Sequence, residues 1–87
     1  MFQSVGLESS KSFTKEKIDS VLSALESGDY GFILRAKGYL KGEEGFIHFD
    51  YIPEEKNVRD GEAMPTGRIC VIGTDLKKDE IISLWEN

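Results

Sequence analysis

The chain has 87 residues, of which 39% are hydrophobic and 31% charged, and its formal net charge is −5. This length suits a single domain, residues 1–87, with a modest core, and the composition is too apolar for a disordered chain. The negative charge, with lysines dispersed among carboxylates, argues against a nucleic-acid-binding or anionic-membrane-binding surface.

The N-terminal third predicts a strand followed by an amphipathic helix. Residues 2–7 form a short mixed segment with apolar Val5 and Leu7, which favours a strand. The helix then has one apolar stripe with the spacing i, i+3, i+4 and i+7, formed by Ile18, Val21, Leu22 and Leu25.

Both ends of this helix carry recognisable signals. Thr14 suits the N-cap, because its hydroxyl can accept a hydrogen bond from a free amide of the first turn. Phe13 and Ile18 then have the spacing of a hydrophobic staple. Gly28 can take the left-handed conformation that ends the helix.

Residues 30–40 and 46–52 predict two further strands. In the first, one face is expected to hold Phe32, Leu34, Ala36 and Leu40. The other face then holds Arg35, Lys37 and Tyr39, together with Ile33. In the second strand, Ile47, Phe49 and Tyr51 lie on one face, opposite His48 and Asp50.

The segment between these strands predicts their register. Gly42-Glu43 is a Gly-Xaa pair, which is typical of a two-residue type II′ hairpin turn. Such a turn sets Ala36 opposite Phe49 and Arg35 opposite Asp50. A loop one residue longer would put Ala36 beside Asp50, and the burial of one face penalises that slip along the whole strand. We therefore expect the two-residue turn.

The last third is irregular, then a strand, then a helix. Residues 57–67 are polar, with Gly61, Pro65 and Gly67 as breakers, and a short strand over 57–60 is possible. Residues 68–73 are β-branched and apolar, as in a central strand. From Asp75 onward the chain predicts a helix with an apolar stripe of Ile81, Leu84 and Trp85, and with Lys77 at its cap.

The predicted order is β-α-β-β-(β)-β-α. We expect an α+β fold with a mostly antiparallel sheet of four to five strands and two amphipathic helices on one face. The other face, which carries Arg35, Lys37, His48 and Asp50, is left for solvent or for a partner. A pair between Arg35 and Asp50 on such a face contributes at most about 1 kcal/mol.

The sequence offers little catalytic chemistry. No glycine-rich phosphate-binding loop precedes a helix. His48 and Cys70, even with Asp50, supply too few ligands for a closed zinc site. We also expect no nucleophile–base pair, so we predict no catalytic and no metal-binding residue, and no enzyme activity.

The single cysteine, Cys70, fits a reducing compartment. There is no run of about 18 apolar residues, as a membrane helix requires, and residues 1–7 do not have the pattern of a signal peptide. We therefore expect a cytoplasmic protein without a membrane partner.

Two segments carry more specific motifs: residues 31–40 read GFILRAKGYL, and residues 68–76 read RICVIGTDL. They resemble the "ilRaKGf" strand and the closing "lvfIGxdL" strand of the C-terminal domain of the CobW family of GTP-dependent metal chaperones. The resemblance covers nearly the whole chain. The family's middle-strand tryptophans are replaced here by Phe46, Phe49 and Tyr51, and its His-rich stretches are absent.

The resemblance implies an accessory domain without chemistry of its own. For the parent protein it implies GTP, magnesium, zinc or cobalt, and a cobalamin-related role. The family's P-loop domain and CxCC metal motif are absent, so the chain is either a fragment or a free-standing relative. We expect it to dock on a GTPase domain of the same or a neighbouring protein, or on a metal-receiving client, through Arg35, Lys37, His48 and Asp50. The alternative is an independent small-ligand or metal-binding module.

Overall fold

Five strands and two helices follow one another in the predicted order. The computed structural model describes residues 1–86. Its elements are β1 (Gln3–Ser9), α1 (Lys15–Glu26), β2 (Phe32–Lys41), β3 (Phe46–Ile52), β4 (Glu55–Gly61), β5 (Gly67–Thr74) and α2 (Lys78–Glu86). The fold is therefore α+β, as the sequence predicts.

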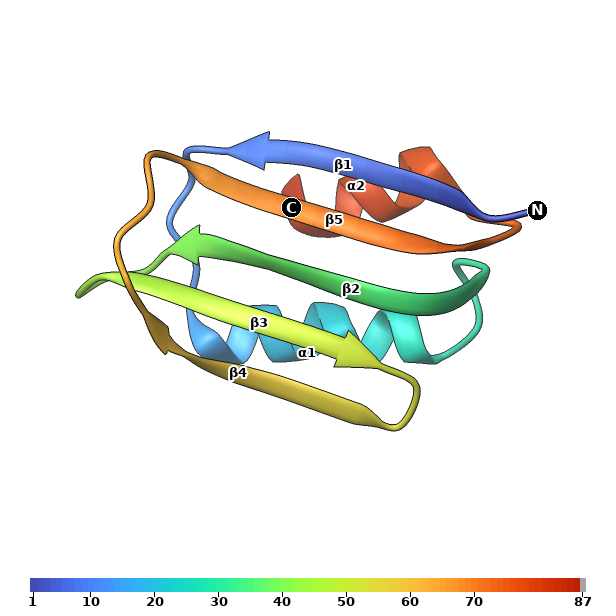
Figure 1. The fold of residues 1–87 in the computed structure, drawn as a ribbon, viewed down its shortest axis with the longest axis horizontal. Coiled ribbons are helices and arrows are strands. Elements are labelled where there is room, and N and C mark those ends of the chain that lie inside the picture. Colours follow the sequence, from blue (N-terminus) through green and yellow to red (C-terminus); the bar gives the residue numbers. More distant parts are fainter. Residues whose placement is uncertain (87) are drawn as a thin grey trace.

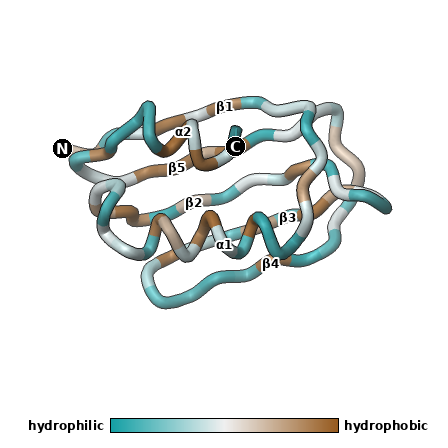
Figure 2. The backbone as a smooth tube through the Cα atoms, turned by 180° about the vertical axis from the view of Figure 1, so that it is seen from behind, coloured by the Kyte–Doolittle hydropathy of each residue, from teal (hydrophilic) through white to brown (hydrophobic). Residues whose placement is uncertain are grey.

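The strands form one sheet in the order β1-β5-β2-β3-β4, and every neighbouring pair is antiparallel. Both helices lie behind this sheet in Figure 1, so the face toward the viewer carries no helix. Figure 2, from behind, shows α1 in front of the strands and α2 beside β1 and β5. The predicted placement of both helices on one face is confirmed. Neither helix is long and apolar enough to cross a membrane, within the residues that the structure describes.

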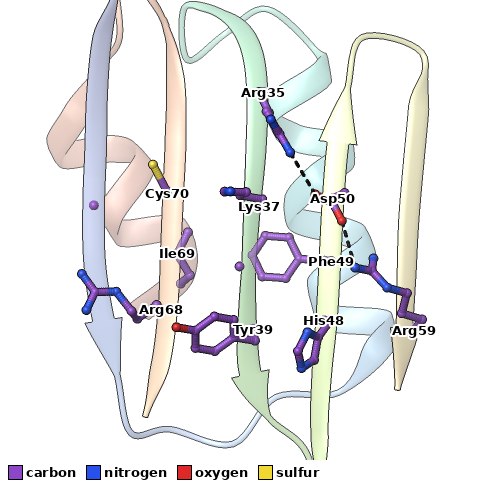
Figure 3. Close-up of a pocket in the computed structure, with 12 residues that line it drawn as sticks. Arg35, Lys37, Tyr39, His48, Phe49, Asp50, Arg59, Arg68, Ile69 and Cys70 are labelled. Atoms are coloured by element: carbon purple, nitrogen blue, oxygen red, sulfur yellow. Dashed lines mark ion pairs between the residues drawn. The ribbon is translucent and has the colours of Figure 1, made fainter. Parts of the chain in front are cut away.

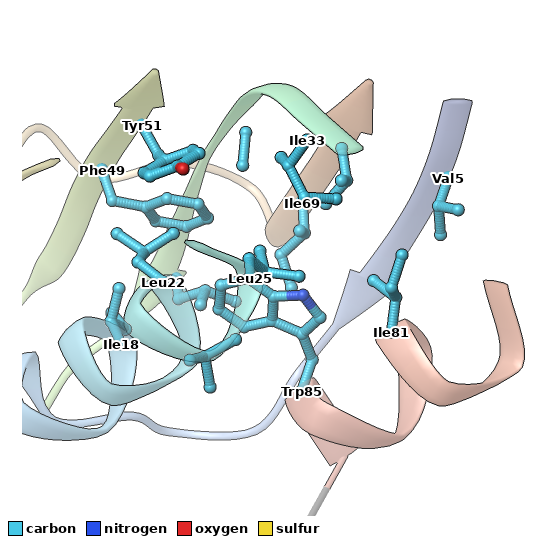
Figure 4. Close-up of a cluster of buried hydrophobic side chains, with 14 of the residues drawn as sticks. Val5, Ile18, Leu22, Leu25, Ile33, Phe49, Tyr51, Ile69, Ile81 and Trp85 are labelled. Atoms are coloured by element: carbon cyan, nitrogen blue, oxygen red, sulfur yellow. The ribbon is translucent and has the colours of Figure 1, made fainter. Parts of the chain in front are cut away.

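The core fills the space between the sheet and the helices. Trp85 of α2 lies at its centre, stacked on Phe49 of β3 (Figure 4) at 5.2 Å between ring centroids. It is also edge-on to Phe13, at 6.3 Å between ring centroids. Buried residues of the described chain are all hydrophobic, apart from glycines. Burial raises the pKa of Tyr51, and the carboxylates of Glu26 and Glu54 add to this shift. The core thus excludes charge and joins α2 to the sheet through one large aromatic side chain.

The predicted ends of α1 are confirmed. The Thr14 hydroxyl accepts a hydrogen bond from the Lys17 amide at 3.0 Å. Phe13 and Ile18 are both buried, as a hydrophobic staple requires. Gly28 follows the C-cap residue and has a φ of 92°, which is the left-handed region that glycine tolerates best.

The second helix begins at Lys78, three residues after the predicted start at Asp75. The Lys77 carbonyl accepts a hydrogen bond from the Ile81 amide at 2.9 Å, so Lys77 stands at the predicted cap position. Leu76 and Ile81 are buried on either side of it. The Gln3 side chain also accepts a hydrogen bond from the Leu76 amide at 2.8 Å, which ties the start of β1 to this end of α2.

The predicted register of the β2–β3 hairpin is wrong by two residues. Ala36 pairs with Tyr51 rather than Phe49, and Asp50 lies opposite Lys37 rather than Arg35. The connection is the four-residue segment 42–45, in which the Gly42 amide donates to the Gly45 carbonyl at 2.6 Å. A shift of two keeps every side chain on its own face, so hydrophobic alternation cannot exclude it.

The predicted face of Ile33 is also wrong. A β-bulge between Ile33 and Arg35 adds one residue to β2 relative to β5. Ile33 is therefore buried with Ala36 and Leu40, whereas Phe32, which was predicted on that buried face, is 59% exposed. The bulge reverses the alternation before Arg35, and period-two reasoning carried across it fails.

The third correction concerns β4, which is longer than the possible strand over residues 57–60. It spans seven residues, Glu55–Gly61, and pairs with β3 along their whole length. It is an edge strand with one half-buried apolar side chain, Val58, and it appears hydrophilic along most of its length in Figure 2. The strand therefore has no apolar alternation by which the sequence could predict it.

Candidate functional site

The sheet face that carries no helix is called the open face below. Strand alternation places on it the residues next to the core residues in each strand. His48 and Asp50 flank the buried Phe49 in β3, and Arg68 and Cys70 flank the buried Ile69 in β5. Cross-strand pairing then sets Cys70 beside Lys37 and Lys37 beside Asp50. The open face is thus a continuous surface across the strands.

All four residues predicted for docking lie together on this face. Arg35, Lys37, His48 and Asp50 line one shallow depression of about 540 Å³. Figure 3 shows them on β2 and β3, with the floor of the depression formed by the strands themselves. The two-residue register error did not separate these residues, because it preserved the face of each one.

The sequence analysis missed two cations of the same depression, Arg59 and Arg68. Arg68 had a usable signal, since it alternates with the buried Ile69 and Val71 in a predicted strand. Arg59 had none, because its place opposite His48 depends on β4, whose composition does not predict a strand of this length. Four cations and one carboxylate line the depression, a local net charge of +3 in a chain whose net charge is −5.

Asp50 holds two of these cations. One carboxylate oxygen lies 3.0 Å from the Arg59 guanidinium, and the other lies 3.8 Å from that of Arg35. The predicted Arg35–Asp50 pair is therefore present, although across a diagonal rather than between directly opposed residues. The side chains remain about half exposed, so each pair contributes little to stability.

Lys37 differs from its neighbours. It lies directly opposite Asp50 in the register, yet no carboxylate within the described residues comes within 4.0 Å of its ammonium group. Figure 3 shows the side chain directed toward β5, away from Asp50. Arg68, by contrast, pairs with Glu8 of β1 at 3.3 Å. Lys37 thus presents the uncompensated charge of the depression.

His48 is held in place by its surroundings. Its Nε2 lies 3.0 Å from the Glu62 carbonyl oxygen, and since a carbonyl only accepts, Nε2 carries the proton. The ring lies 5.5 Å from that of Tyr39, tilted by 38°. It also lies over Gly61, where an added Cβ would approach ring atom Cδ2 to 2.1 Å. These contacts hold the His48 ring in place on the open face.

The geometry does not assemble a metal site from His48 and Cys70. These residues lie on β3 and β5, with β2 between them. Residues 1–86 contain no group of three or more His, Cys, Asp or Glu side chains arranged to hold a metal ion. The arrangement can therefore attract anions and present donors, but in this part of the chain it offers no ligand set of the kind that zinc requires.

Comparisons with known proteins connect this fold to one family. The family described as "Cobalamin synthesis protein cobW C-terminal domain" matches residues 2–87. Two solved structures share the fold: zinc-bound YjiA GTPase from E. coli, at 19% identity, and a zinc-bound triple mutant of YjiA GTPase, at 18%. Both have a TM-score of 0.82, and each match covers 98% of this chain and 29% of the other. The chain thus spans less than a third of these proteins. No curated protein sequence matches it.

Proposed function

This chain belongs to the cobalamin synthesis protein cobW C-terminal domain family, and from this membership we propose that it is the accessory domain of a CobW-like, GTP-dependent metallochaperone. The parent protein would use GTP and magnesium and would carry zinc or cobalt, in the cytoplasm. The zinc named for the similar YjiA GTPase is consistent with such a parent. We assign the accessory domain no catalytic residue and a role in docking.

The observation that carries the docking role is the distribution of charge over the two sheet faces. One face is covered by α1 and α2, whereas the open face gathers Arg35, Lys37, Arg59 and Arg68 around one depression. A positive surface attracts an acidic partner and speeds its association. We propose that a GTPase domain, of the same or a neighbouring protein, or a metal-receiving client docks on this face.

The first prediction tests this role with an Arg35→Ala, Lys37→Ala double variant. The double variant should bind the separately produced GTPase domain about tenfold more weakly at low salt, because removing interface cations slows association with an acidic partner. The difference should shrink at high salt, where exposed charges are screened. Calorimetry or surface plasmon resonance at two salt concentrations measures both effects.

The matched control is a Lys77→Ala, Lys78→Ala double variant. It removes the same charge from two exposed residues at the start of α2, which lies behind the sheet. It should bind the GTPase domain like the unmodified chain. Equal weakening by both double variants would show that the effect depends only on net charge. Unchanged affinity in the Arg35/Lys37 variant would show that the open face is not part of the interface.

The second prediction separates an accessory domain from an independent nucleotide-binding module. The isolated chain should show no saturable micromolar binding of GTP with magnesium. Its glycines are distributed over turns and strands rather than in a phosphate-binding loop before a helix. Calorimetry with GTP and magnesium measures this directly, and a saturable isotherm that is lost in the Arg35/Lys37 variant would favour the small-ligand alternative.

A further inference from the structure

The open face has an apolar end. Phe2, Phe32 and Ile52 are 70%, 59% and 46% exposed, and Ile72 is half-buried. Ile52 follows the buried Tyr51, and Ile72 follows the buried Val71, so alternation places both on the open face. Phe32 precedes the buried Ile33 at the same end of the sheet, where it also borders a hollow with Leu25 and Glu26 at the end of α1. These three residues and Phe2 are called the apolar end below.

Phe2 joins this group through the contact made by its neighbour. Gln3 reaches the backbone of Leu76, on the side of the sheet where α2 begins. Phe2 directly precedes β1 and is exposed at this end of the sheet. Since Gln3 pairs with Gly73 and Phe32 pairs with Thr74, Phe2 and Phe32 flank the end of β5. This is the end of the sheet where the N-terminus lies in Figure 1.

The apolar end runs directly into the cationic depression. Ile72 pairs with Arg35 across β5 and β2. Ile52 lines a second hollow of the same face together with Arg35 and Asp50. One surface therefore offers exposed apolar side chains, then Arg35 with its carboxylate partner, then the uncompensated ammonium group of Lys37. Exposed apolar residues gathered beside polar ones are typical of an interaction surface.

This combination selects among anionic partners. A free phosphate or a nucleic-acid backbone would satisfy Lys37 and Arg68, but it would leave the aliphatic side chains of Ile52 and Ile72 in water. Protein interfaces instead bury apolar and aromatic side chains at their centre and set charged groups around them. The partner that fits both halves is a protein segment with carboxylates next to apolar side chains.

We propose that the open face binds an acidic segment of a partner protein, with apolar side chains of that segment against the apolar end and a carboxylate on Lys37. This assignment rests on the docking role proposed above and adds the chemistry of the partner to it. It makes Lys37 the central charged contact, because the neighbouring arginines already have carboxylate partners within the chain.

The test uses four probes of equal length on the isotope-labelled chain, followed by NMR. The first probe is a synthetic peptide of Glu and Leu residues. The second peptide has Ser in place of Leu, and the third has Lys in place of Glu. The fourth probe is a single-stranded oligonucleotide. The Glu/Leu peptide should shift amide signals of β2, β3 and β5 and bind at least about tenfold tighter than each other probe. Stronger binding of the Lys/Leu peptide or of the oligonucleotide would overturn the assignment.

Variants locate both halves of the contact. Lys37→Glu should abolish binding of the Glu/Leu peptide, while Lys37→Arg should retain it. A Phe2→Ser, Ile52→Thr variant, which changes only exposed side chains, should reduce affinity about tenfold for the Glu/Leu peptide and leave the Glu/Ser peptide unaffected. Unchanged affinity in this variant, with folding verified by the dispersion of its NMR spectrum, would remove the apolar end from the site.

The outcome is separable from that of the docking proposal. If the GTPase domain fails to bind while the Glu/Leu peptide occupies the open face, the GTPase partner is wrong and the partner chemistry stands. If the GTPase domain binds through Arg35 and Lys37 but is unaffected by the Phe2/Ile52 variant, docking stands and the apolar contact is wrong.

Discussion

The two faces of the sheet are built from alternate residues of the same strands, yet their side chains contribute very differently to the free energy of unfolding. Along β3, Phe49 and Tyr51 are almost completely buried under the helices, while Asp50 between them is about half exposed. Full burial of such an apolar side chain is worth about 1.5–3 kcal/mol, whereas a half-exposed ion pair contributes about 0–1 kcal/mol. Side chains of the helix-covered face therefore supply most of the stability. Side chains of the open face can change to suit a partner with little loss of stability.

The sharpest way to break this comparison is to remove Trp85 from the covered face. Trp85→Ala should lower the free energy of unfolding by about 3–5 kcal/mol, because it leaves a cavity between Phe13 and Phe49. That loss is a large part of the stability of a small domain. Urea unfolding followed by circular dichroism measures it.

Trp85→Phe is the matched control. It keeps a ring in the stack and removes an indole N–H that has no hydrogen-bond partner among the described residues. It should therefore cost clearly less than the alanine variant. A loss below about 1 kcal/mol for Trp85→Ala would mean that α2 contributes little to the fold, contrary to the burial of Trp85 and Ile81.

The same contrast explains what the sequence could predict. Apolar periodicity identified α1 and the sides of β3 and β5, because burial of one face imposes a strict pattern. Periodicity defines which face a side chain occupies but not its partner across the strand. The β2–β3 pairing could therefore shift by two residues without moving any apolar side chain to water.

The remaining errors arose where burial gives no signal. The bulge at Ile33–Arg35 depends on how β2 pairs with β5, which lies more than thirty residues later in the chain. The edge strand β4 has no buried side chain and one half-buried one, Val58, so nothing in its composition separates it from a loop. For the same reason Arg59 could not be assigned to the site, whereas Arg35, Lys37, His48 and Asp50 could.

The second largest expected effect also depends on pairing that the sequence does not reveal. Gly38 is part of β2, next to β5, and an added Cβ would lie 2.1 Å from the Arg68 carbonyl oxygen and 3.0 Å from the Phe49 ring. Gly38→Ala should destabilise the domain by about 1–3 kcal/mol, because the two backbones must separate to admit a methyl group. Thermal unfolding measures the loss.

Gly6→Ala is the control for this variant. Gly6 is also a strand glycine beside β5, but an added Cβ there meets only the Ile69 carbonyl oxygen at 3.9 Å, an ordinary contact. It should be tolerated, since alanine restricts the unfolded chain more than glycine does. Equal destabilisation by both variants would show that glycine serves general strand flexibility here rather than close approach at Gly38.

The smallest effect is expected on the open face. The Arg35→Ala, Lys37→Ala double variant should change the free energy of unfolding by less than about 1 kcal/mol, although it removes two charges from the most cationic part of the chain. Arg35 lies 3.8 Å from Asp50, and that carboxylate keeps its closer contact with Arg59 at 3.0 Å when Arg35 is gone. Lys37 has no carboxylate within 4.0 Å in the described chain, so its removal leaves no charge unpaired. Removing positive charge from an acidic protein costs some general attraction, which salt screens. Urea unfolding at two salt concentrations, with the Lys77→Ala, Lys78→Ala variant as the control, measures this cost.

A loss of about 2 kcal/mol or more, specific to the Arg35/Lys37 variant and persistent at high salt, would show that the open face contributes to stability. The weaker binding expected of the same variant would then have to be read as a folding defect.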